Sequence, residues 1–115
     1  AIARARDLGP VEPERAAEAL GSGNHVIAQD TVPFTLWCAA RHPGDYEAAI
    51  WCTLRGLGDR DTTCAIVGGI VALSAPPETV PAAWRASREP LAYQPARPDR
   101  AKRVIDAAPG ALRAV

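Results

Sequence analysis

The sequence is notable for what it has little of, namely Lys, Met and any surplus of charge. Its 115 residues include no Met and a single Lys, and 13 basic residues balance 13 acidic ones to a formal net charge of zero. Proteins that bind nucleic acid or anionic lipid present a clustered basic surface. The balanced charge therefore argues against both a nucleic-acid partner and a membrane partner.

Long hydrophobic runs are also absent. The longest, residues 64–75, contains two glycines and falls well short of the ~20 apolar residues that a membrane-spanning helix requires. The first residues do not form a basic segment followed by an apolar one, the pattern of a signal peptide. We therefore expect a cytoplasmic protein.

Cysteine and histidine are sparse. Cys38, Cys52 and Cys64 are widely separated, and no pair has the C-x-x-C spacing of a zinc or redox motif. Free, buried thiols in a reducing compartment are the expectation. His42 stands in a His-Pro-Gly turn, typical of a surface position, while His25 follows a glycine-rich loop, which leaves a role near a ligand open.

The periodic segments are rich in Ala, Leu, Arg and Glu, and no long stretch alternates apolar and polar residues. We expect helices at residues 1–8, 13–20, 32–41, 46–57, 60 to about 75, 80–87 and 99–107, with an extended segment at 89–97. This pattern predicts an all-α fold, a compact multi-helix orthogonal bundle, with one domain over residues 1–115. The uncapped helix at residue 1 further predicts that the chain is a piece of a larger single-domain protein.

Residues 64–73 are apolar on nearly every side, which predicts the most buried helix of the bundle. Each of its two adjacent glycines costs ~1 kcal/mol of helix stability relative to Ala. We expect this cost to be offset by packing, because a glycine lets another helix approach closely.

An acidic cluster precedes this helix. Asp59, Asp61 and Thr62 offer two carboxylates and a hydroxyl within four residues, the hard oxygen ligands that Mg²⁺ or Mn²⁺ prefers. The alternative is structural, since Asp59 is a good helix cap and Asp61 complements the helix dipole. A calcium-binding EF-hand loop is excluded, because its sixth and twelfth positions would be Cys64 and Ile70. A haloacid-dehalogenase-like D-x-D-x-T motif is disfavoured too. In that family the motif ends a buried strand, whereas here it follows the helix predicted at residues 46–57.

Residues 58–72, GDRDTTCAIVGGIVA, resemble the C-terminal metal motif of the ADP-ribosylglycohydrolases, whose usual form is G-D-x-D-T before a helix of small residues. Three flanking segments are similar to the family's in the same order: residues 30–37 (DTVPFTLW), 45–49 (DYEAA) and 80–84 (VPAAW). The resemblance covers about residues 20–91. The family includes the enzyme that reactivates ADP-ribosylated dinitrogenase reductase, which implies a bacterial protein here.

The resemblance implies an all-helical hydrolase with a dinuclear Mg²⁺ or Mn²⁺ site, in which Asp59, Asp61 and Thr62 are metal ligands. The metals of the family hold the ribose hydroxyls of ADP-ribose. The expected partner is therefore an ADP-ribosylated protein or an ADP-ribose-like small molecule. Arg60 stands where the family more often has Thr, and we expect it to face solvent.

The chain also departs from the family. The remaining ligands, a Thr-Asp-Asp run and a catalytic acidic residue, belong to an N-terminal half, and no Thr-Asp-Asp or Ser-Asp-Asp occurs here. We therefore expect the C-terminal portion of such an enzyme, inactive by itself, with no catalytic residue of its own and with the N-terminal half of the fold as its partner. Substrate-binding residues are not assigned. The alternative is a non-catalytic helical binding or interaction module that has lost the catalytic half.

Overall fold

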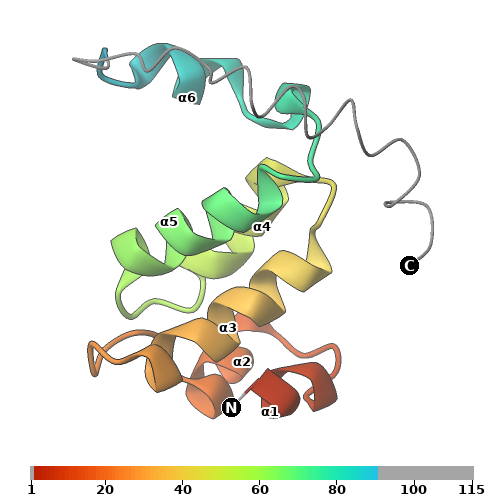
Figure 1. The fold of residues 1–115 in the computed structure, drawn as a ribbon, viewed down its shortest axis with the longest axis vertical. Coiled ribbons are helices and arrows are strands. Elements are labelled where there is room, and N and C mark those ends of the chain that lie inside the picture. Colours follow the sequence, from red (N-terminus) through yellow and green to blue (C-terminus); the bar gives the residue numbers. More distant parts are fainter. Residues whose placement is uncertain (1, 91–115) are drawn as a thin grey trace, which may run out of the picture.

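The computed structural model describes residues 2–90, which form α-helices joined by short loops (Figure 1). The elements are α1 (Ile2–Asp7), α2 (Pro13–Leu20), α3 (Ala28–Arg41), α4 (Tyr46–Leu54), α5 (Arg60–Val71), the 3-10 helix η1 (Pro77–Thr79) and α6 (Ala82–Ser87). No strand occurs among these residues, so the all-α prediction is confirmed. The helix expected at residues 99–107 lies outside the described residues, as does most of the extended segment at 89–97.

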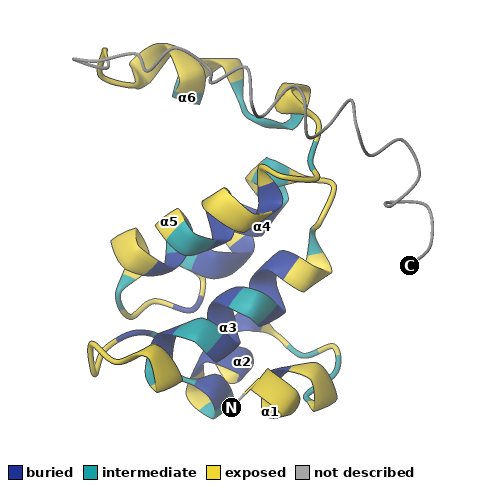
Figure 2. Cartoon of the chain, in the orientation of Figure 1, coloured by how far each residue is buried: buried dark blue, intermediate teal, exposed yellow. Residues whose placement is uncertain are grey.

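Helix α3 is the centre of the fold. Helices α1, α2, α4 and α5 all pack against it, and half of its residues are buried: Thr31, Pro33, Phe34, Thr35, Trp37, Cys38 and Ala39. Figure 2 shows the buried positions gathered along α3 and the facing sides of its neighbours. Neither η1 nor α6 has a buried residue. Within the described part of the chain, no helix is long and apolar enough to cross a membrane.

The start of α3 lies earlier than the sequence pattern predicted. The helix begins at Ala28, so Pro33 lies inside it and not in its first turn. Thr31, which would be the capping residue of a helix beginning at residue 32, lies inside the helix, and its hydroxyl donates to the carbonyl oxygen of Ile27 at 3.1 Å. The extra turn is held by the preceding loop, whose Gly23 N–H donates to the carbonyl oxygen of Asp30 at 3.2 Å. Such a contact leaves no trace in local periodicity.

Three further helix ends differ from expectation, and the first is that of α5, which ends at Val71 and not near residue 75. Helix α4 ends at Leu54, and single-turn hydrogen bonds carry the chain on to residue 57. Helix α6 begins at Ala82, after Pro81, and not at residue 80, so Thr79 is not in the capping position. The Thr79 hydroxyl instead accepts from the N–H of Tyr46 at 3.2 Å, tying this segment to the start of α4.

Helix α5 is not the most buried helix, contrary to the prediction. One face, carrying Thr63, Val67, Gly68 and Val71, packs on α3 and α4. On the opposite side Gly69 is exposed. A helix that is apolar all round can be covered by neighbours on one side only, and sequence does not say which neighbours are present.

The two glycines of α5 are therefore expected to respond differently to substitution. A Cβ at Gly69 would meet no atom within 4 Å, whereas one at Gly68 would lie 2.6 Å from the Tyr46 hydroxyl oxygen. We expect Gly69→Ala to raise the free energy of unfolding of this chain by up to ~1 kcal/mol, because Ala has the higher helix propensity. Gly68→Ala should give no such gain. Urea denaturation of both variants tests the difference, and an equal gain would contradict the packing of Gly68 against Tyr46.

Candidate metal site

The predicted metal ligands stand at the N-terminal end of α5. Asp59 precedes the helix, and its carboxylate accepts a hydrogen bond from the N–H of Thr62 at 3.3 Å. The Thr63 hydroxyl donates to the carbonyl oxygen of Asp59 at 2.8 Å. Asp59 is thus a helix cap, as the structural alternative required. A cap fixes the position of the carboxylate on a rigid element, which a preorganised ligand also needs.

The structure brings the two carboxylates of the motif together. A hydrogen bond shared with the Asp61 carboxyl is the largest factor that lowers the pKa of Asp59, followed by hydrogen bonds from the side chain and N–H of Thr62. Asp61 and Thr62 are exposed, and so is Arg60, as expected. Two carboxylates in such proximity are both ionised only at an electrostatic cost, which a cation between them would remove.

A glycine-rich loop, residues 21–27, covers the inner side of this cluster. The N–H of Asp59 donates to the carbonyl oxygen of Ser22 at 3.0 Å. A Cβ at Gly23, whose φ is +90°, would lie 2.9 Å from the Asp59 Cβ, so only glycine fits this approach. The start of α3 and the start of α5 consequently lie at the same end of the bundle (Figure 1).

The same loop places a third carboxylate, that of Asp30, at this end of the bundle. Its side chain is only 13% exposed and accepts from the N–H of His25 at 2.9 Å, and the His25 Nδ1 lies 3.2 Å from its other oxygen. The hydrogen bond from the His25 N–H is the main factor that lowers the pKa of Asp30. Sequence reasoning quoted Asp30 only as part of a flanking segment. The glycines at the start of the loop indicate a tight turn, but they do not indicate which residue the loop would contact.

Comparison with protein families adds an independent observation. The family model described as ADP-ribosylglycohydrolase matches residues 1–112. The chain belongs to the ADP-ribosylglycohydrolase family. Searches among curated proteins and among solved structures found no match. The family match extends beyond residues 20–91, on which the motif resemblance rests.

Within an ADP-ribosylglycohydrolase, the donors at α5 have the right chemistry for Mg²⁺ or Mn²⁺, since all are hard oxygens. They are too few for a complete site. Among the described residues, no group of three or more His, Cys, Asp or Glu side chains is placed to hold a metal ion. Asp59, Asp61 and Thr62 thus fit as one part of a coordination sphere, and their role as ligands stays a prediction.

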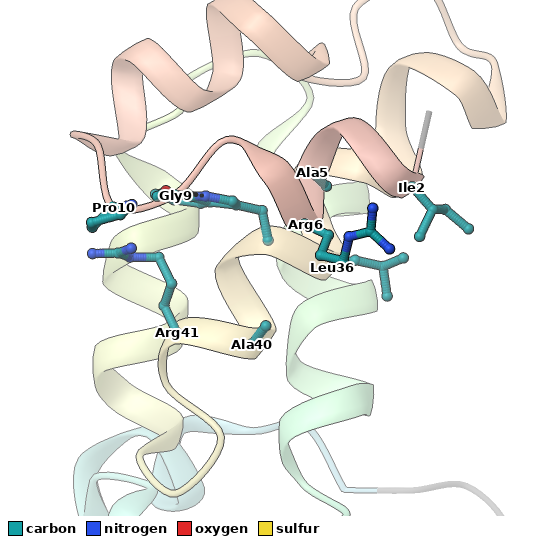
Figure 3. Close-up of a pocket in the computed structure, with 9 residues that line it drawn as sticks. Ile2, Ala5, Arg6, Gly9, Pro10, Leu36, Ala40 and Arg41 are labelled. Carbon is teal, nitrogen blue, oxygen red and sulfur yellow. Dashed lines mark hydrogen bonds between the residues drawn. The ribbon is translucent and has the colours of Figure 1, made fainter.

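A cavity of the described region lies away from the motif. It has a volume of about 460 Å³ and is lined by Ile2, Ala5, Arg6, Gly9, Pro10, Leu36, Trp37, Ala40 and Arg41. Pro10 and Arg41 lie at one end of it and Ile2 and Leu36 at the other (Figure 3). This groove between α1 and the C-terminal half of α3 contains none of the motif residues and no carboxylate. We therefore place the candidate site of this ADP-ribosylglycohydrolase at the motif and not at this cavity.

Proposed function

We propose that this chain is the C-terminal, metal-binding portion of a Mg²⁺- or Mn²⁺-dependent hydrolase that removes ADP-ribose from modified protein side chains or related conjugates. The observation that carries the proposal is the G-D-R-D-T motif, whose two carboxylates meet at the start of α5 in a chain of the ADP-ribosylglycohydrolase family. We also propose that the protein is bacterial and acts in the cytoplasm.

In the proposed site, Asp59, Asp61 and Thr62 hold part of a dinuclear centre. A divalent ion supplies charge neutralisation and orients substrate oxygens and water when bound. The protein's contribution is position. The backbone of Asp59 is anchored to Ser22, and the hydrogen bonds at the start of α5 lower the pKa of its carboxyl further below neutral pH. The general acid or base and the remaining ligands would come from the N-terminal half of the fold, so the isolated chain is expected to be inactive.

A second candidate function has its own support. The Asp59 carboxylate accepts from the N–H of Thr62 in the first turn of α5, and this alone accounts for an acidic residue there. In a helical binding or interaction module, the motif would need to do no more than cap this helix. The two functions differ in whether the complete protein releases ADP-ribose, and the proposed hydrolase further requires that this release depend on a divalent metal.

The deciding assay follows the release of free ADP-ribose from an ADP-ribosylated protein by the complete polypeptide that contains this chain. We expect release with Mg²⁺ or Mn²⁺, loss of release when the metal is removed by a chelator, and recovery when the metal is restored. No release under any metal condition would favour the binding module. Release that persists in the chelator would overturn the metal dependence while leaving a hydrolase.

A further inference from the structure

The groove beside α1 continues on the other side of α3 as a second groove. The second groove has a volume of about 240 Å³ and is lined on α3 by Leu36 and Ala40 and on α5 by Ile70 and Val71. Leu36 and Ala40, which are one helical turn apart, also line the groove beside α1. The two grooves are therefore halves of one trough, with α3 as its floor and α1 and α5 as its walls.

The trough has an apolar surface that is open to solvent in the described part of the chain. Ile2 on the α1 wall is 61% exposed, and Ile70 on the α5 wall is 36% exposed. On the floor, Leu36 is half-buried and Ala40 is exposed. A contiguous exposed apolar surface is typical of an interface with another protein segment. An elongated trough between helices suits an amphipathic helix, whose apolar face lies in the groove.

The charged side chains of the trough are both arginines, and Figure 3 shows them at the groove beside α1. The Arg41 guanidinium lies 4.7 Å from the centre of the Trp37 ring, and no ion pair among the described residues includes it. The Nε of Arg6 lies 2.7 Å from the carboxylate of Asp7, which does not line the trough. No described Asp or Glu lines either groove. A complementary occupant therefore carries carboxylates beside its apolar face.

This charge distinguishes between the candidate occupants. Residues 91–115 contain more basic than acidic residues, so they are not complementary to the trough. Two copies of the chain that met through this face would bring the arginines of both copies into one interface, where like charges repel. An acidic segment of different sequence fits both the apolar floor and the arginines.

We propose that the trough holds an acidic amphipathic helix from the N-terminal half of the complete polypeptide, with its apolar face on Leu36 and Ala40 and its carboxylates beside Arg6 and Arg41. This inference rests on the proposed function, which assigns the remaining metal ligands to that half. Ile70 is near the end of α5, whereas the motif stands at its start. A helix in the trough would thus hold the two halves together without occupying the metal site.

Photo-cross-linking of the complete polypeptide tests the proposal. The photoreactive amino acid p-benzoylphenylalanine replaces Ile2 in one variant and Ile70 in another, so that each wall of the trough is probed in turn. After irradiation and peptide mapping, we expect both positions to be linked to the same segment upstream of residue 1, one that contains Asp or Glu. A link to residues 91–115, a link to a second copy, links to two different segments, or the absence of a link from either wall would each overturn the proposal.

Trp51 provides the control for the photochemistry. It lies outside the trough, and its ring is 6.2 Å from that of Trp84 in a T-shaped contact. The same photoreactive residue at position 51 should therefore link to α6 and not to the upstream segment.

Charge reversal tests the role of the arginines. Arg41→Glu in the complete polypeptide should lower the yield of both cross-links by about 5-fold, the upper end of the effect of an exposed ion pair. Changing the carboxylate found opposite Arg41 to Lys should restore the yield, and failure to restore it would overturn the charge pairing. Arg85→Glu is the matched control, because Arg85 stands in the last turn of α6 as Arg41 stands in the last turn of α3. If Arg41→Glu does not fold, the cross-links made with Arg41 intact still decide.

Release of ADP-ribose, measured on the same preparations, separates this inference from the proposed function. Cross-links from both walls in a polypeptide that releases no ADP-ribose would support the docked helix and overturn the hydrolase. Metal-dependent release without these cross-links would support the hydrolase and overturn the docked helix.

Discussion

Replacing Asp59 by Asn should lower metal-dependent release of ADP-ribose by the complete protein at least ~100-fold, since even residues that only support a metal ligand are worth about 10- to 100-fold. Asn caps helices about as well as Asp, so α5 should keep its start. What the substitution removes is the negative charge of the Asp59 carboxylate, which stands at the start of α5. Initial rates at saturating Mn²⁺, with circular dichroism for the fold, measure the effect.

Asp45 provides the matched control. It precedes α4 as Asp59 precedes α5, and its carboxylate accepts from the N–H of Ala48 at 3.0 Å. Asp45→Asn therefore changes the same residue type in the same capping role, but away from the motif. We expect it to leave the release of ADP-ribose unchanged. If both variants lost activity equally, or if Asp59→Asn kept full activity, Asp59 would be a cap alone and the proposed ligand set would fail.

From the sequence, only the part of the site formed by neighbouring residues could be predicted. Asp59, Asp61 and Thr62 are neighbours in the chain, so their spacing alone predicted a cluster of oxygen ligands, and the structure places them at one helix start. The approach of Gly23 to Asp59 joins segments far apart in the sequence. No periodicity or spacing reports such a contact, and the inner wall of the site was therefore missed.

In the fold, too, local features were predicted correctly and features that depend on tertiary contacts were not. The existence and type of the helices followed from composition and periodicity, and Pro13–Leu20 was predicted with the bounds that the structure has. The errors concern features that depend on tertiary contacts. Helix α3 begins early because the loop before it bonds to Asp30, and α5 is half-covered because no described helix packs on its outer face. An apolar segment indicates burial but not which side is buried.

The largest expected effect on stability is that of Phe34→Ala, which should lower the free energy of unfolding by ~3–5 kcal/mol, the usual cost of removing a buried aromatic ring. Phe34 is 1% exposed, and its ring stacks near Trp37 with centroids 6.3 Å apart. It also fills the space beside Gly56, where a Cβ would come within 2.5 Å of the ring. Urea denaturation measures the loss.

The position of Phe34 gives this prediction a second consequence. Gly56 begins the turn that leads from α4 to Asp59, so the ring supports the backbone on which the motif stands. We expect Phe34→Ala to weaken Mn²⁺ binding by the complete protein as well as stability, although Phe34 is not a ligand. Leu73→Ala is the control, because Leu73 is 89% exposed and its truncation should change stability by no more than ~0.5 kcal/mol. Equal losses in the two variants would contradict the placement of Phe34 in the core.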